Sequence, residues 1–128
     1  MNIRFVLVIV LILIGGHARA EQTYVCTTLD VFDVEAGRFA RSKKSDFWLG
    51  AVGQLVVDTR SGAIKIGDQK AADWKIVQKG GANNDFVAMP GLLAPSDSIR
   101  LRFFKKPVTF VLMSNGFNFF SGTCEALY

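Results

Sequence analysis

Short apolar or alternating segments, separated by turn residues, recur about every ten residues from position 24 toward the C-terminus. In residues 99–103, Ile, Leu and Phe alternate with two Arg, which is the pattern of a half-buried strand. No segment keeps a helical period beyond one or two turns, and residues 67–73 can form at most a short helical turn. The pattern predicts an all-β fold, a small antiparallel β-barrel or β-sandwich of about seven or eight strands.

Turn residues mark the connections between these strands. A turn is expected at Ala36-Gly37, and Asp58 to Gly62 supplies the turn of a hairpin over residues 54–66. Asp58 is expected to cap the backbone of its own turn. Strands are expected among the apolar or alternating runs at 24–34, 47–49, 55–57, 63–66, 74–77, 86–89, 99–103, 108–114 and 117–124, of which 47–49 and 55–57 are the shortest.

The C-terminal hairpin carries the clearest local signal. Asn115-Gly116 is the pair most favoured in a two-residue type I′ turn, and apolar runs flank it. Such a turn would oppose Leu112 with Phe119 and would place Phe117 on the same face. Phe120 would lie on the other face. Because both faces are apolar, we expect this hairpin to be covered on both sides or to lie at a barrel seam.

The N-terminal segment differs from the rest of the chain. Arg4 precedes the apolar run FVLVIVLILI, and Ala18-Arg19-Ala20 follows it as a cleavage site with small residues at both key positions. The run is shorter than the roughly 18–20 apolar residues that span a bilayer. The sequence therefore predicts a signal peptide over residues 1–20 and a single exported β domain over residues 21–128. That domain would be periplasmic or extracellular, with no transmembrane segment.

Removal of the signal peptide changes the charge and the available chemistry. Without Arg4 and Arg19, 13 basic residues face 11 acidic ones, a net charge of +2 instead of +4. This balance argues against nucleic acid, which usually requires a dense basic face. His17, the only histidine, is also removed. The mature chain cannot then form a His-containing catalytic triad or a His-ligated metal site, and we expect no cofactor.

Two cysteines remain, Cys26 and Cys124, near the two ends of the mature chain. In an exported protein an even pair is most simply a disulfide. Redox-active pairs are usually close in sequence as C-x-x-C, whereas these two are far apart. We expect a structural bridge that places the first and last strands side by side or face to face, which would protect the sheet edges.

Candidate catalytic residues are few. Asp33 and Glu35 project to the same side of a strand, and a carboxylate pair can serve acid–base glycoside cleavage. Their position just before the Ala36-Gly37 turn is also typical of a solvated strand end. No phosphate-loop, nucleophile-elbow, zinc-protease or EF-hand motif is present. The sequence therefore favours a non-enzymatic protein.

Two groups of basic residues are candidates for binding. One group surrounds Phe39, and the other lies on the strand at 99–103. If they met in space, they would form a cationic patch suited to an anionic glycan, a lipid headgroup or an acidic protein surface. The alternative is that these are solvated charges that guard sheet edges. The candidate patch comprises Arg38, Arg41, Lys43, Lys44, Phe47, Trp48, Arg100 and Arg102.

A resemblance concerns Ser61-Gly62, which stands in an expected hairpin turn of an exported β domain with a disulfide. The periplasmic inhibitors of c-type lysozyme are similar in architecture and present a Ser-Gly-x-x-Tyr loop to the enzyme. Here Lys65 stands where that motif has its tyrosine. The resemblance implies an inhibitor of an exported enzyme as one alternative function. A second alternative is a carrier of a small apolar ligand in a β-barrel cavity, lined by aromatic residues that the core does not use.

Overall fold

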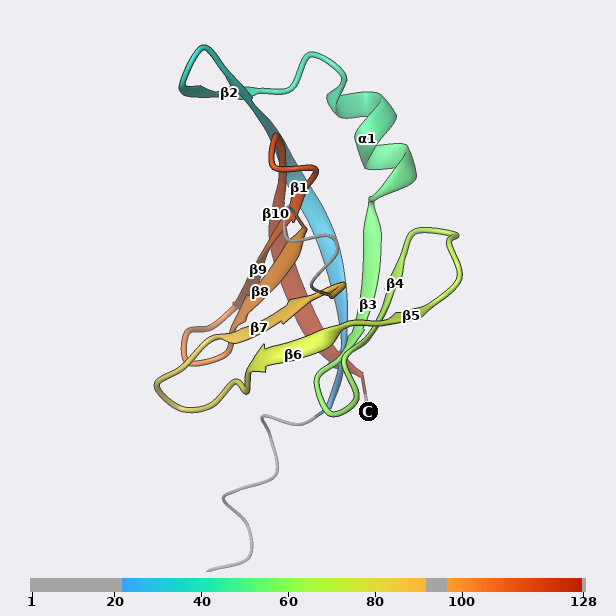
Figure 1. Cartoon of the computed structure of the whole chain (residues 1–128), viewed down its shortest axis with the longest axis vertical. Helices are drawn as coiled ribbons and strands as arrows, with labels where there is room; N and C mark the ends of the chain where they lie inside the picture. Colours follow the sequence, from blue (N-terminus) through green and yellow to red (C-terminus); the bar gives the residue numbers. More distant parts are fainter. Residues whose placement is uncertain (1–21, 92–96, 128) are drawn as a thin grey trace, which may run out of the picture.

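The computed structural model describes residues 22–91 and 97–127, which form one antiparallel sheet and one short helix (Figure 1). The expected signal peptide lies outside the described residues. The all-β class is confirmed, although the sheet has ten strands. The elements are β1 (Thr23–Glu35), β2 (Arg38–Arg41), α1 (Ser45–Ala51), β3 (Gln54–Asp58), β4 (Ala63–Ile66), β5 (Ala72–Asp73), β6 (Lys75–Gln78), β7 (Phe86–Met89), β8 (Ser98–Arg102), β9 (Val108–Ser114) and β10 (Asn118–Leu127).

The sheet curls into a nearly closed barrel. Its strands follow the order β5-β4-β3-β1-β10-β9-β8-β7-β6, and β2 extends β1 as a short hairpin. The two outermost strands, β5 and β6, are consecutive in the chain and meet at Trp74. The Trp74 N–H donates to the Gly62 carbonyl oxygen, N···O 2.8 Å. β5, before Trp74, pairs with β4, and β6, after it, pairs with β7. The higher strand count arises here and at β2.

The disulfide joins the first and last long strands, as the sequence predicted. Cys26 and Cys124 are bonded and stand directly opposite each other in the β1–β10 register. Both side chains are buried. Of the two expected arrangements the strands adopt the side-by-side one, and neither strand is an edge of the sheet. Gly122 allows close approach of the two backbones, because a Cβ there would collide with the Thr27 carbonyl oxygen.

Apolar side chains fill the interior of the barrel. Phe86, Phe110 and Phe120 are almost fully buried, and aliphatic residues from six strands pack around them. At the end where β1 begins, the rings of Tyr24 and Phe103 stack with centroids 5.1 Å apart. The helix α1 packs against the opposite end (Figure 1).

The helix is the first departure from the sequence expectation, which placed a strand at 47–49. Trp48, Leu49 and Val52 lie on one side of a helical turn and contact the core. Thr28 fixes the far end of α1, because its hydroxyl donates to the Val52 carbonyl oxygen and its N–H donates to that of Gly53. A helix this short is marginal alone, so these tertiary contacts decide its conformation.

The second departure is the register of the β9–β10 hairpin. The turn lies at Asn115-Gly116 as expected, with both residues at positive φ, but Phe117 also belongs to the loop. Leu112 therefore pairs with Phe120, and Phe119 pairs with Met113, one position away from the prediction. A shift of one residue exchanges the two faces of a strand. Phe120 points into the core. The opposite face of the hairpin is partly exposed, for example at Val111, so the hairpin is not covered on both sides along its whole length.

Candidate functional site

The first basic group lies at one end of the barrel. We define the β2–α1 end as residues 34–48, which comprise the tip of β1, β2, the connection and the start of α1 (Figure 1). A buried serine, Ser42, anchors this segment: its N–H donates to the Val31 carbonyl oxygen, N···O 2.9 Å. Its hydroxyl oxygen accepts from the Lys44 N–H, N···O 3.2 Å. The connection is thus held to the barrel.

The cations of this end face solvent. Arg38, Arg41, Lys43 and Lys44 are exposed, and within residues 34–48 the exposed carboxylates are those of Glu35 and Asp46. Arg41 approaches Asp30 at 3.8 Å, but both side chains are largely solvated, so this pair contributes little. The β2–α1 end therefore carries an excess of accessible positive charge.

Phenylalanine side chains are exposed at the same end. Phe39 on β2 is 69% exposed and Phe47 on α1 is 66% exposed. Phe117, in the β9–β10 turn, is 65% exposed, and its carbonyl oxygen accepts from the Val34 N–H at 3.0 Å. Three chain segments thus present large apolar side chains to solvent beside the cations.

The outer face of the sheet extends this apolar surface. Phe119 pairs with Phe32 in the β1–β10 register, and the Phe39 ring meets the Phe119 ring edge-on with centroids 5.1 Å apart. Arg41 pairs with Phe32 across β1 and β2. We call Phe32, Phe39 and Phe119 the aromatic strip. Sequence reasoning missed it, because the assumed two-residue turn put Phe119 on the same face as Leu112, which is buried in the structure; a three-residue loop would have revealed it.

Trp48, one of the predicted patch residues, turns inward. Its ring contacts that of Phe120 edge-on, with centroids 5.6 Å apart, and also that of Phe47, at 5.2 Å. Phe47 remains exposed on α1. Of the predicted Phe47-Trp48 pair, Phe47 is therefore on the surface and Trp48 packs against the end of the barrel.

Arg100 and Arg102 lie apart from the β2–α1 end. Both contact the buried carboxylate of Asp85: Arg102 donates to its two oxygens at 3.2 and 3.4 Å, and Arg100 approaches within 3.7 Å. In the register, Arg100 is separated from Asp30 of β1 by β9 and β10, or roughly 14 Å at the usual strand spacing. These two arginines therefore share the Asp85 carboxylate at the start of β7 and do not join the cations of the β2–α1 end.

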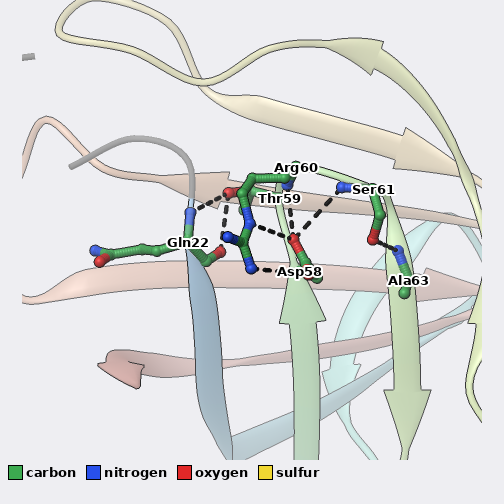
Figure 2. A network of polar contacts seen from close by, with 6 residues as sticks. All are labelled: Gln22, Asp58, Thr59, Arg60, Ser61 and Ala63. Atoms are coloured by element: carbon green, nitrogen blue, oxygen red, sulfur yellow. Dashed lines mark hydrogen bonds and ion pairs between the residues drawn. The ribbon is translucent and has the colours of Figure 1, made fainter. Parts of the chain in front are cut away.

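The turn between β3 and β4, which contains Ser61-Gly62, is held by polar contacts (Figure 2). Asp58 Oδ1 accepts from the Arg60 N–H at 2.9 Å and the Ser61 N–H at 3.4 Å, so the predicted capping role is confirmed. The Ser61 hydroxyl oxygen accepts from the Ala63 N–H at 3.1 Å. Burial alone would raise the pKa of Asp58, but hydrogen bonds from the Arg60 and Ser61 backbone and the Arg60 guanidinium outweigh it and lower the pKa below its usual value.

Asp33 and Glu35 lie near the tip of β1. Glu35 is exposed, whereas Asp33 is half-buried and its Oδ1 atom is buried without a hydrogen-bond partner among the described residues. Asp33 pairs with Asn118 of β10 in the register. No group of three or more Cys, Asp, Glu or His side chains suited to a metal ion occurs within residues 22–91 and 97–127.

A pocket of about 250 Å³ opens at the end of the barrel that α1 covers. Its floor includes Leu112 and Phe120 of the core, and Trp48 and Trp74 contribute to its walls. Phe86, Phe110 and Phe120 of the barrel interior belong to one packed core cluster. One binding space thus lies at the mouth of the barrel, and a second pocket of about 380 Å³ lies along β6 and β7, lined by Lys75, Ile76, Val77, Met89 and Gly91.

Comparison with known proteins adds no relative: the chain matches no family model, no curated protein and no solved structure. In the described part of the chain, no helix has the length and apolar character needed to cross a bilayer. The fold and its surfaces therefore define the class, a disulfide-linked antiparallel barrel with a cationic, aromatic end.

Proposed function

We propose that the protein is an exported, non-enzymatic binding protein that docks through its β2–α1 end onto an anionic lipid surface. The observation that carries the proposal is the exposure of Phe39, Phe47 and Phe117 beside four accessible cations at one end of a rigid barrel. Export is supported by the disulfide, since such bonds persist in oxidising compartments.

The combination of side chains favours lipid over the other anionic partners. A headgroup region offers negative charge to Lys and Arg and an apolar boundary to aromatic rings at the same depth. A polyanionic glycan would use the cations but would leave the exposed rings of Phe39 and Phe47 in water. The aromatic strip continues the apolar surface along β1 and β10. Residues next to the inserted phenylalanines could therefore also contact the membrane surface.

Vesicle co-sedimentation tests the proposal. The purified protein should bind vesicles of phosphatidylcholine and phosphatidylglycerol but not pure phosphatidylcholine, and binding should fall as salt rises. Each cation near an anionic membrane contributes about 1 kcal/mol, so reversing Arg41, Lys43 and Lys44 to Glu should weaken binding by at least about 100-fold. The fold should survive, because exposed charges contribute under ~1 kcal/mol each.

A matched control reverses Lys75, Lys79 and Lys105, which are exposed outside the β2–α1 end, and changes the net charge equally. This control should retain most of the vesicle binding. Phe39→Ala with Phe47→Ala should weaken binding at every salt concentration, whereas Phe104→Ala should not. Equal loss in both charge-reversal variants would indicate a net-charge effect and would contradict the proposal. Retention on an anionic polysaccharide or an acidic protein, with no vesicle binding, would also contradict it.

A further inference from the structure

The pocket at the barrel mouth adjoins the β2–α1 end through Trp48, but none of the cations or exposed phenylalanines of that end lines it. Its volume of about 250 Å³ is below the roughly 300–1,000 Å³ of pockets that hold drug-sized ligands, so it fits a ligand of about one ring. Trp48 from α1 and Trp74 from the β5–β6 junction both line it. The two indole side chains offer apolar area to such a ring.

Polar groups stand at the same mouth. Gln69 and Lys70 reach it from the β4–β5 connection, and Asp97 and Ser114 reach it from the side of β8 and β9. Asp97 is fixed at the rim, because its Oδ1 accepts from the Asn115 N–H at 2.7 Å. The pocket thus combines hydrogen-bond donors on one side with a carboxylate and a hydroxyl on the other.

A further polar row leads away from the pocket wall. Ser114 pairs with Asn118, and Asn118 pairs with Asp33, so these three residues share the inner face of the sheet. Directly paired residues lie on the same face, about 4.5–5.5 Å apart. The Asp33 Oδ1 atom is buried and accepts no hydrogen bond from the described residues. Asn118 and Asp33 do not line the pocket, so the acceptors that a ligand meets on this side are Asp97 and Ser114.

From this geometry we propose that the pocket binds one ring of a neutral sugar. A sugar ring has an apolar face that packs on an indole, and its hydroxyl groups both donate to the Asp97 carboxylate and accept from Lys70 and Gln69. Neutral character follows from the opposing charges of Lys70 and Asp97, the two charged side chains that line the pocket. A small amine would pair with the Asp97 carboxylate but would be repelled by Lys70 at the same mouth.

Titration of the purified protein with methyl glycosides of glucose, galactose and N-acetylglucosamine tests this inference. Binding in the millimolar range should shift the NMR signals of the Trp48 and Trp74 indole N–H groups. Lys70→Ala and Asp97→Asn should each raise the dissociation constant by about fivefold, which is the loss of affinity expected for one hydrogen bond. Asn at position 97 still accepts from the Asn115 N–H, so the rim should keep its structure.

Glu125→Gln and Lys105→Ala serve as matched controls, because neither residue lines the pocket, and both should leave the affinity unchanged. Failure of all three glycosides to shift either indole signal would overturn the inference. So would binding that Lys70→Ala and Asp97→Asn leave unaltered, or a shift of both indole signals by butylammonium chloride but by no glycoside. Vesicle binding is measured separately, so it succeeds or fails independently of this result.

Discussion

Removal of the disulfide by Cys26→Ala with Cys124→Ala should lower the free energy of unfolding by about 4–5 kcal/mol. The bridge joins residues 98 positions apart, and the chain-entropy model assigns about 4.7 kcal/mol to closing a loop of ~100 residues. The loss arises mainly in the unfolded chain, because the β1–β10 register pairs nine further positions in the folded state without the bridge. Small domains have a total stability of about 5–15 kcal/mol, so the variant should be marginal.

Urea unfolding followed by the fluorescence of Trp48 and Trp74 measures this effect. With a slope of about 1–3 kcal/mol/M, the midpoint should fall by more than about 1 M, and the slope should rise because the unlinked chain exposes more surface when unfolded. Cys26→Val with Cys124→Val separates packing from cross-linking, since Val fills the buried space without a bond. If the Val pair restored wild-type stability, the bridge would act by packing and the loop-entropy reasoning would be refuted.

Two further predictions concern backbone contacts. Gly122→Ala should destabilise the protein by about 1–3 kcal/mol, because the added Cβ would meet the Thr27 carbonyl oxygen. Gly50→Ala is the control: the Cβ there has open space, so this change in α1 should be neutral or slightly stabilising, and equal urea midpoints for the two variants would contradict the prediction. The pKa of Asp58 is lowered in the folded state, so its contribution to stability is complete above the unfolded pKa of about 3.9 and is lost as pH falls through the folded value. Asp58→Asn should therefore be less stable than wild type by on the order of 1 kcal/mol at neutral pH. This difference should shrink as the pH falls through the folded pKa of Asp58, and a difference that does not change with pH would exclude this linkage.

The sequence by itself determined the local structure of most of the barrel. Turn residues such as Asp58 to Gly62 and Asn115-Gly116 restrict the backbone dihedral angles of a few neighbours, so their positions were correctly predicted. Alternation in segments such as 99–103 likewise predicted which side chains are buried. The pairing of Cys26 with Cys124 followed from their number and from the export that the N-terminal segment predicts.

The tertiary structure alone decided what depends on distant contacts. The segment at 47–49 is helical because Trp48 and Val52 pack against the barrel end, which no local pattern encodes. One additional loop residue, Phe117, shifts the β9–β10 register and moves Phe119 to the outer face, where it forms the aromatic strip with Phe32 and Phe39. The mouth pocket likewise combines segments from α1 to β10. Local chemistry sets turns and alternation, whereas register and packing depend on partners far away in the chain, and only the folded barrel brings those partners together.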